Sequence, residues 1–217
     1  MASIIDLDEF VDDDRTPQDI EPVLIDSGIE PRYVKGFAMI EERTPVIAKA
    51  KAGALSFAET FNPKETSWGL RLSGPTGIGK TLFASAIARS ITERTGASLI
   101  FWKVPSLFET MKGRFGAPWG EPQPGELVDE CVEASVLVLD DVGAANVSQW
   151  VHDMLYAIID RRYSQLKAII VTSNLSDADL EKALGERTAS RLFDMTRRFA
   201  LTNDSQRTPA RPKKSRK

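Results

Sequence analysis

The residues most suited to chemistry in this chain form a glycine-rich loop that ends in a lysine and a threonine, residues 74–81. The spacing of Gly74, Gly79, Lys80 and Thr81 matches the loop whose backbone N–H groups wrap the phosphates of a nucleotide. Lys80 would reach the β- and γ-phosphate oxygens, and Thr81 would offer its hydroxyl to Mg²⁺. The pattern predicts an ATP site formed by Gly74, Pro75, Thr76, Gly77, Ile78, Gly79, Lys80, Thr81 and Leu82.

Two consecutive aspartates, Asp140 and Asp141, follow a continuous apolar run at residues 136–139. Such a run is typical of a strand buried on both faces of a parallel sheet, and its carboxyl end would lie beside the phosphate loop. There Asp140 would bind Mg²⁺, mostly through water, and Asp141 would orient or deprotonate an attacking water molecule. Alternatively, the pair only begins a turn before Gly143.

A second apolar run, residues 168–171, leads into Thr172, Ser173 and Asn174. If this run is a neighbouring parallel strand, the Asn174 amide reaches the same edge of the sheet and would align water against the γ-phosphate. Asparagine is also a good cap for the turn that follows a strand. The residues alone leave both roles for Asn174 open.

Two arginines further along, Arg187 and Arg191, are four residues apart and therefore lie on one face of a helix. A guanidinium is suited to stabilising charge on a phosphoryl group during transfer. Arginines at this spacing equally form ordinary surface salt bridges. The spacing does not decide between these roles.

The elements that must position these residues alternate between strands and helices. Apolar residues at helical spacing predict helices, and short apolar runs predict strands. This alternation predicts an α/β fold with a parallel sheet covered by helices on both sides. The predicted strands are residues 68–72, 98–102, 136–139 and 168–171, and the predicted helices are 46–61, 81–94, 105–112, 126–133 and one that includes 150–159.

The composition indicates one compact domain and excludes several classes of protein. The chain has 217 residues, of which 42% are hydrophobic, enough for one sizeable core. No apolar run is long enough to span a membrane, and the acidic start lacks the pattern of an export signal, so we expect a cytoplasmic protein without a membrane partner. Cys131 is the single cysteine and His152 the single histidine, which excludes an internal disulfide and disfavours a Cys/His metal site.

The net charge of −3 conceals two ends of opposite sign. Residues 1–28 are acidic and residues 208–217 are basic, and both are predicted to be disordered because they contain too few apolar residues to fold. In the interior, Lys112, Arg114 and Phe115 combine cations with an aromatic ring, which is typical of contacts to single-stranded DNA. The alternative is a solvated loop with Phe115 buried in the core.

Five segments together resemble the DnaC/IstB branch of the AAA+ ATPases. They are the phosphate loop and residues 139–143, 159–163, 172–175 and 185–192. The resemblance extends over about residues 29–207 and implies a helical lead-in at 29–67 and a P-loop AAA+ core at 68–207, with little or no C-terminal lid. It implies that Lys80 and Thr81 are the Walker A residues, Asp140 and Asp141 the Walker B pair, Asn174 sensor 1, Arg191 an arginine finger that reaches ATP on a neighbouring subunit, and Arg207 a sensor 2 residue that contacts nucleotide.

The same resemblance implies a function on DNA. This branch contains replicative-helicase loaders and the ATPase helpers of transposons, which assemble on DNA with ATP. We therefore expect a helicase-loader-like ATPase from a phage or mobile element that binds ATP and Mg²⁺, forms an oligomer and contacts DNA and a replicative helicase. Asp141 stands where many AAA+ proteins have glutamate, which suggests slow hydrolysis. The alternatives are a transposition helper that binds a transposase, an adaptor that binds ATP without hydrolysing it, and a small-molecule kinase.

Overall fold

The computed structural model describes residues 20–116, 118, 121, 123–143 and 149–202. Helices and strands alternate along most of this stretch, as the apolar pattern predicts. In chain order the elements are α1 (Ile20–Asp26), η2 (Pro31–Tyr33), η3 (Gly36–Met39), α2 (Pro45–Thr60), β1 (Gly69–Ser73), α3 (Lys80–Thr95), β2 (Leu99–Lys103), α4 (Val104–Gly113), α5 (Pro124–Glu133), β3 (Val136–Asp140), α6 (Gln149–Ser164), β4 (Ile169–Ser173), α7 (Asp177–Leu184), α8 (Glu186–Asp194) and β5 (Thr196–Ala200).

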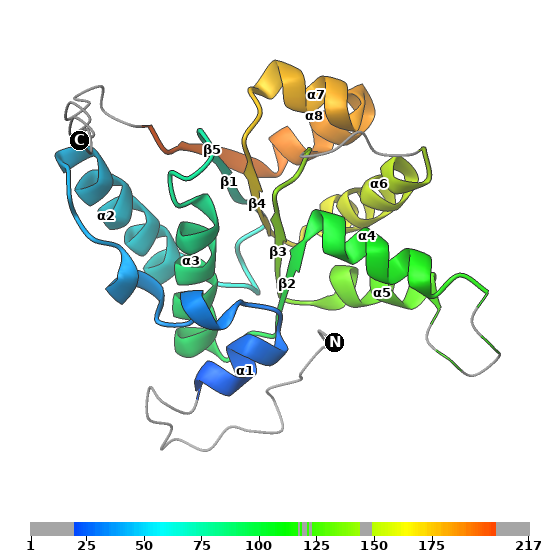
Figure 1. The fold of residues 1–217 in the computed structure, drawn as a ribbon, viewed down its shortest axis with the longest axis horizontal. Coiled ribbons are helices and arrows are strands. Elements are labelled where there is room, and N and C mark those ends of the chain that lie inside the picture. Colours follow the sequence, from blue (N-terminus) through cyan, green and yellow to red (C-terminus); the bar gives the residue numbers. More distant parts are fainter. Residues whose placement is uncertain (1–19, 117, 119–120, 122, 144–148, 203–217) are drawn as a thin grey trace, which may run out of the picture.

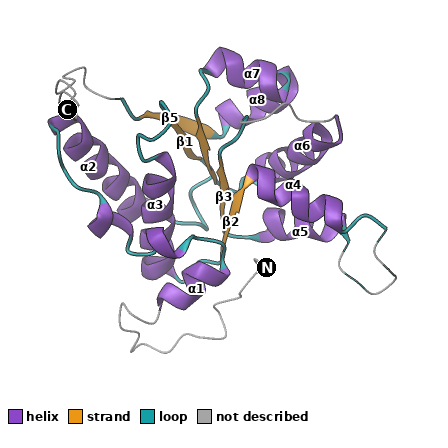
Figure 2. Ribbon diagram, viewed as in Figure 1, coloured by secondary structure: helices purple, strands orange, loops and turns teal. Residues whose placement is uncertain are grey.

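Five parallel strands form one sheet in the order β2-β3-β4-β1-β5. Figure 1 shows α2 and α3 on one side of this sheet and α4 to α8 on the other. Coloured by secondary structure, the same view shows two helical layers around a central layer of strands (Figure 2). The predicted α/β class, a parallel sheet flanked by helices, is confirmed.

Two apolar cores lie on the two faces of the sheet. One joins α2, α3 and the segment around Leu24 and Ile29 to the strands, and the other joins α4 to α8 to the opposite face. Every residue of β1, β3 and β4 is buried. This double burial is the physical reason why the two predicted strands at 136–139 and 168–171 read as continuous apolar runs.

The strand register brings the chemically suited residues to one edge. Ser73 at the end of β1 pairs with Ser173 at the end of β4, so the loops that begin at Gly74 and Asn174 leave the sheet side by side. In the same way Lys103 at the end of β2 pairs with Asp140 at the end of β3. Because all the strands are parallel, their carboxyl ends form a single edge.

Two elements differ from the expectation. Residues 20–28 were expected to belong to a disordered tail, but 20–26 form α1 and its Leu24 is fully buried, so that part of the prediction is wrong. Leu24 is the only buried residue of α1, and one apolar residue is too weak a pattern to predict a helix from the sequence. Strand β5 was not predicted, because it lies at the edge of the sheet with Arg197 and Arg198 exposed and therefore has no apolar run.

Several expectations concern residues outside the described part of the chain. They are the acidic residues 1–19, the basic end at 208–217, the absence of a lid and the role of Arg207. The boundary between a lead-in at 29–67 and a core at 68–207 stays a prediction, although Ile29 and Val34 share one apolar core with α3. None of the helices in the described residues is long and apolar enough to cross a membrane.

Candidate nucleotide-binding site

The phosphate loop connects β1 to α3 through a tight turn that two glycines make possible. A Cβ on Gly74 would lie 2.2 Å from the Leu201 carbonyl oxygen, and Gly79 has φ = 98°, in the left-handed region. Gly79 is also the N-cap of α3 and supplies no side-chain cap. The first N–H groups of α3 therefore point into the loop, where they and the helix dipole favour an anion.

Lys80, the first residue of α3, lies folded over this loop. Its Nζ donates hydrogen bonds to the carbonyl oxygens of Gly74 (2.9 Å) and Pro75 (3.0 Å), and a further one to Oδ1 of Asn174. The side chain is almost completely buried, and this burial lowers the pKa of Lys80, while the nearby Asp141 and Asp140 oppose the shift. The ammonium group is thus held at the centre of the predicted phosphate site.

Asp140 lies beside Lys80 and is fixed by two threonines. Thr81 Oγ1 donates to its carboxylate at 3.0 Å, and Thr172 Oγ1 donates to the same carboxylate at 2.7 Å. Only 2% of Asp140 is exposed, and burial raises its pKa, although the two hydroxyl donors partly counter the effect. Among the described residues, only hydroxyl groups donate to this carboxylate. A buried charge without a cationic partner is costly, and a bound cation would offset that cost.

The pair of oxygens from Thr81 and Asp140 fits Mg²⁺. This ion prefers hard oxygen ligands and keeps several of its waters, so a hydroxyl and a carboxylate 3.0 Å apart suffice from the protein side. The remaining ligands would come from water and from the phosphates of the nucleotide. Bound there, Mg²⁺ would neutralise charge on the phosphate oxygens.

Asp141 and Asn174 form the second part of the site. Asn174 Nδ2 donates to Oδ1 of Asp141 at 3.1 Å, and the backbone N–H of Asp141 donates to Thr172 Oγ1 at 2.9 Å. Asp141 has φ = 64°, an unusual conformation for a residue other than glycine. Unusual backbone conformations of this kind cluster at functional sites.

A pocket of about 440 Å³ encloses these side chains. Sequence reasoning missed five of its lining residues, namely Tyr33, Lys103, Pro105, Ser106 and Thr172. Lys103 and Thr172 could have been found, because Lys103 ends β2 and Thr172 lies one residue before the end of β4, at the same edge of the sheet as Asp140. Tyr33 comes from η2, far away in the sequence, and no pattern in the sequence indicates its position.

Arg191 lies away from this pocket, on α8. Its Nε forms an ion pair with Asp160 at 2.9 Å and its Nη1 donates to the Tyr156 hydroxyl at 2.5 Å, both on α6. Arg187, one turn earlier, is exposed, and its guanidinium lies 5.9 Å from the centre of the Tyr156 ring. Neither arginine belongs to the lining of the pocket around the phosphate loop.

The three residues considered for DNA do not share one environment. Phe115 is 58% exposed and lies 5.0 Å from the Trp150 ring, so the alternative that it is buried in the core is wrong. Lys112 is exposed at the end of α4. Arg114 instead lines a second pocket, of about 480 Å³, together with Lys103 and residues of α1.

The sheet is parallel, has this strand order, and carries a phosphate loop between β1 and α3 with polar strand ends beside it. These features define a P-loop nucleotide-binding protein with the AAA+ fold. The family model described as IstB-like ATP binding protein matches residues 54–212, which is most of the chain. The chain therefore belongs to this family.

Individual relatives include proteins of replication and of a mobile element. The chain is 30% identical over 126 residues to the replicative helicase loader DnaI of Bacillus subtilis, and 36% identical over 107 residues to a putative ATP-binding protein of insertion sequence IS1162 from Pseudomonas fluorescens. These alignments cover 58% and 49% of this chain but only 39% and 43% of the two relatives. The chain thus matches less than half the length of either protein.

A crystal structure of the DnaC helicase loader has a similar fold. The two structures superpose with a TM-score of 0.71 at 28% sequence identity, over 79% of this chain and 99% of that one. The family-level expectation from the sequence, a DnaC/IstB-type P-loop protein, is confirmed.

Proposed function

We propose that this protein is a helicase-loader-like ATPase that acts on DNA in replication and hydrolyses ATP at the interfaces between its own subunits. The observation that carries the proposal is the hydrogen-bonded set Lys80, Asn174 and Asp141 beside the Thr81 and Asp140 pair. Such a set offers a cation for the phosphates, oxygens for Mg²⁺ and a carboxylate for water. The similarity to DnaI and DnaC supports the choice of a helicase loader over other ATPases.

Within one subunit, each residue of this set has a separate task. The N–H groups of the loop and the start of α3 bind the phosphates, and Lys80 moves from its carbonyl partners to the β- and γ-phosphate oxygens. Asp141 orients or deprotonates the attacking water molecule, and Asn174 holds the Asp141 carboxylate in place through its amide. Aspartate is one methylene shorter than the glutamate of many AAA+ proteins, so we expect slow turnover.

Completion of the site requires a second copy of the chain. Within the described residues, the lining of the pocket contains no arginine. Arg191 lies elsewhere, on α8, where it contacts α6. Charge develops on the γ-phosphoryl group during transfer, and an arginine supplied by a neighbour is a well-known way to stabilise it. We therefore assign this role to Arg191 and expect ATP to promote assembly.

DNA would bind at the end of α4. Phe115 presents an exposed ring beside Trp150, and Lys112 adds a charge nearby in the sequence. An exposed aromatic ring and a cation are the two parts of a stacking site for single-stranded DNA. In an oligomer, several copies of this site would contact the same DNA strand, and their contributions to the binding affinity would add. In this way a chain with a net charge of −3 could still bind DNA.

A second candidate function is that of a transposition helper which recruits a transposase to DNA. It is favoured by the match to the IstB-like family and by the 36% identity to the insertion-sequence protein. The nucleotide site would work in the same way in both cases. A third candidate is an adaptor that binds ATP without hydrolysing it, in which the nucleotide only shifts a conformational equilibrium.

The deciding experiment measures phosphate release from Mg-ATP over a range of protein concentrations, with and without single-stranded DNA. The variants are Lys80→Ala, Arg191→Ala and an equimolar mixture of the two. We expect the activity per subunit to rise with concentration, both variants to be inactive alone, and the mixture to regain part of the activity. Flat activity per subunit with no rescue would contradict hydrolysis between subunits, and ATP binding without phosphate release would favour the adaptor.

A parallel pull-down distinguishes the two DNA-linked functions. The protein is incubated with ATP and either a replicative helicase or the transposase of an insertion sequence from the same host. Retention of the helicase supports the loader, and selective retention of the transposase supports the transposition helper. The Lys80→Ala variant is the control for dependence on ATP.

A further inference from the structure

Two side chains of α6, Tyr156 and Asp160, contact the guanidinium of Arg191 from two directions. Asp160 Oδ1 lies 2.9 Å from Nε, and the Tyr156 hydroxyl accepts a hydrogen bond from Nη1 at 2.5 Å. The guanidinium carbon is also 5.0 Å from the centre of the Tyr156 ring. Tyr156 and Asp160 are one helical turn apart, so together they form a single platform on α6.

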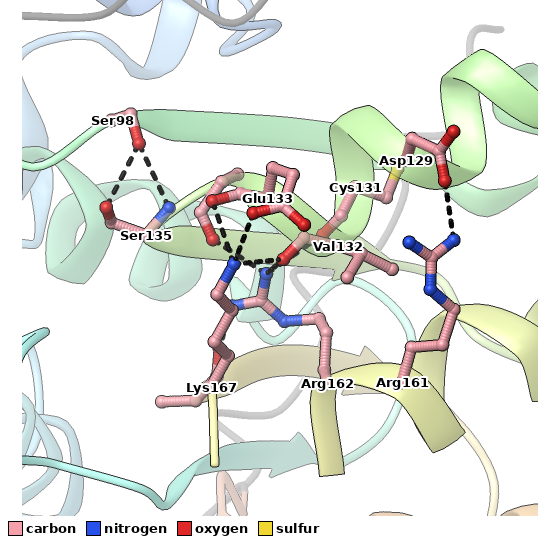
Figure 3. A network of polar contacts seen from close by, with 11 residues as sticks. Ser98, Asp129, Cys131, Val132, Glu133, Ser135, Arg161, Arg162 and Lys167 are labelled. Carbon is pink, nitrogen blue, oxygen red and sulfur yellow. Dashed lines mark hydrogen bonds and ion pairs between the residues drawn. The ribbon is translucent and has the colours of Figure 1, made fainter. Parts of the chain in front are cut away.

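This platform belongs to a helix that is fixed to the core by a neighbouring residue. Arg162, two positions after Asp160, is fully buried and donates to the carbonyl oxygens of Cys131 (2.9 Å), Val132 (3.2 Å) and Ala134 (2.7 Å), and also to that of Ala168. Figure 3 shows how these contacts tie α6 to the end of α5 and to the segment before β4. Because α6 is fixed in this way, the side chains of Tyr156 and Asp160 have a defined orientation relative to the sheet.

The platform occupies only part of the guanidinium. Arginine has five N–H donors, and the contacts with Asp160 and Tyr156 use one on Nε and one on Nη1. Within the described part of the chain no hydrogen bond of Nη2 is present, and the side chain is 29% exposed. The Nη2 edge is therefore available to a planar or tetrahedral anion approaching from outside.

We propose that Tyr156 and Asp160 are positioning residues that orient Arg191 towards the phosphates of ATP bound by a second copy of this chain. The inference rests on the proposed function, because it assumes that Arg191 acts between subunits. A free arginine side chain loses considerable rotamer entropy when it binds a phosphate. A guanidinium that is already held on one edge, as that of Arg191 is, loses less. The guanidinium of Arg187 lies 5.9 Å from the centre of the same Tyr156 ring.

The first test compares Tyr156→Phe and Asp160→Asn with the wild type. Both changes preserve the size of the side chain and remove only the hydroxyl or the charge. We expect each to lower the turnover number for ATP by roughly three- to tenfold, because a misplaced group costs rate steeply. The affinity of the same subunit for ATP, measured with a fluorescent analogue at low protein concentration, should stay within about twofold, because the phosphate loop is not touched.

The matched control is Asp129→Asn. Asp129 lies on α5 and forms an ion pair at 2.6 Å with Arg161 of α6, as Figure 3 shows. It is not one of the two partners of Arg191, which are Asp160 and Tyr156. We expect its turnover number to equal that of the wild type. An unchanged or higher turnover number in both Tyr156→Phe and Asp160→Asn overturns the proposal, and so does a loss of the same size in Asp129→Asn.

The second test separates positioning of Arg191 from simple packing of α6 on α8. A Lys80→Ala subunit cannot bind ATP productively but still offers its own Arg191, so it should rescue Arg191→Ala subunits. The double variant Lys80→Ala/Asp160→Asn should rescue them roughly three- to tenfold less well than Lys80→Ala alone, whereas Lys80→Ala/Asp129→Asn should rescue them as well as Lys80→Ala. Equal rescue by both double variants would show that Asp160 does not act through Arg191 and would overturn the proposal.

The outcomes also distinguish this inference from the proposed function. If Lys80→Ala itself fails to rescue Arg191→Ala while both variants are folded, as judged by thermal unfolding, then hydrolysis between subunits is wrong and the positioning role fails with it. If rescue by Lys80→Ala works but Asp160→Asn and Tyr156→Phe behave like the wild type, only the positioning role fails.

Discussion

Lys80 at the end of the phosphate loop donates a hydrogen bond to Asn174 at the end of β4, 94 positions away in the chain. The same amide donates from its other end to Asp141, so Asn174 connects the cation and the carboxylate of the site. Within the described residues, the hydrogen-bond acceptors of Lys80 Nζ are all neutral oxygens, two carbonyls and one amide. A phosphate oxygen, which carries charge, is a stronger acceptor than any of these and would displace them.

The first prediction concerns Asn174→Ala. Without the amide, Asp141 loses the partner that orients its carboxylate, so we expect the turnover number to fall by about 10- to 100-fold. The affinity for ATP should be unchanged or slightly higher, because Lys80 loses a competing acceptor. Phosphate release and equilibrium binding measured on the same preparation check both parts.

A matched control for Asn174→Ala is Ser176→Ala. Ser176 lies two residues after Asn174 and is the N-cap of α7, where its side chain accepts a hydrogen bond from the backbone N–H of Asp179 at 3.2 Å. Within the described residues it has no hydrogen bond with Lys80 or Asp141. Loss of this cap should reduce stability by about 1 kcal/mol and leave turnover intact. A similar loss of turnover in both variants would mean that Asn174 acts only by shaping the start of α7.

The second prediction concerns the exposed ring of Phe115. Phe115→Ala should weaken binding of single-stranded DNA by about 1 to 3 kcal/mol for each base that stacks on the ring. Lys112→Ala should instead reduce the dependence of binding on salt, because it removes one phosphate contact. Fluorescence anisotropy with a labelled oligonucleotide at several salt concentrations measures both effects.

Leu166→Ala is the control for a general effect of exposed apolar surface. Leu166 is 70% exposed, and it follows α6 rather than α4. Its replacement should leave DNA binding unchanged. If Phe115→Ala and Leu166→Ala bind DNA as tightly as the wild type, the assignment of DNA contacts to the end of α4 is wrong.

Much of the fold was predictable because the parallel sheet leaves a direct trace in the sequence. Strands buried on both faces require continuous apolar runs, and the residues that follow them, Asp140 and Asn174, must then lie at one edge. The phosphate loop adds a characteristic spacing of glycines, lysine and threonine that few other structures require. From these two facts alone, most of the nucleotide site could be placed before its geometry was known.

What the sequence could not predict depends on contacts between distant segments. The edge strand β5 carries two exposed arginines and lacks an apolar run, so no periodicity indicates it. Tyr33 reaches the pocket from a short 3₁₀ turn near the start of the chain. The partners of Arg191 lie on a different helix, and only the packing of α6 against α8 brings Asp160 and Tyr156 to it.

The third prediction compares two adjacent arginines of α6. Arg162 is fully buried among carbonyl oxygens, and although burial lowers its pKa to about 10, the guanidinium stays charged at neutral pH. Arg162→Met leaves several buried carbonyls without donors and should reduce the free energy of unfolding by about 3 kcal/mol or more. Arg161→Met removes only a largely exposed ion pair with Asp129 and should cost less than about 1 kcal/mol.

Urea unfolding followed by circular dichroism measures this difference between the two arginines. A third variant, Arg162→Lys, retains a positive charge but lacks the fork that reaches several carbonyls at once, so we expect an intermediate loss. If Arg161→Met and Arg162→Met are equally stable, the buried contacts of Arg162 do not hold α6 in place.

The fourth prediction is a pH dependence at Glu30, whose carboxylate forms ion pairs with Lys103 at the edge of the pocket and with Arg32. The hydrogen bond from Lys103 lowers the pKa of Glu30 below its ordinary value of 4.5, while partial burial opposes the shift. Because the folded-state pKa is the lower one, ionised Glu30 stabilises the fold above about pH 4.5, and this contribution is lost as the pH falls through the folded-state pKa.

Glu30→Gln should therefore reduce the free energy of unfolding by less than about 1 kcal/mol at pH 7, since the pair is partly exposed. The difference from the wild type should vanish once the pH falls below the folded-state pKa of Glu30. Glu109→Gln, at an exposed position on α4, is the control and should show no difference at any pH. Urea unfolding of all three proteins across this pH range gives the measurement. A difference at Glu30 that persists at low pH would show that the side chain stabilises the fold by packing and not by its charge.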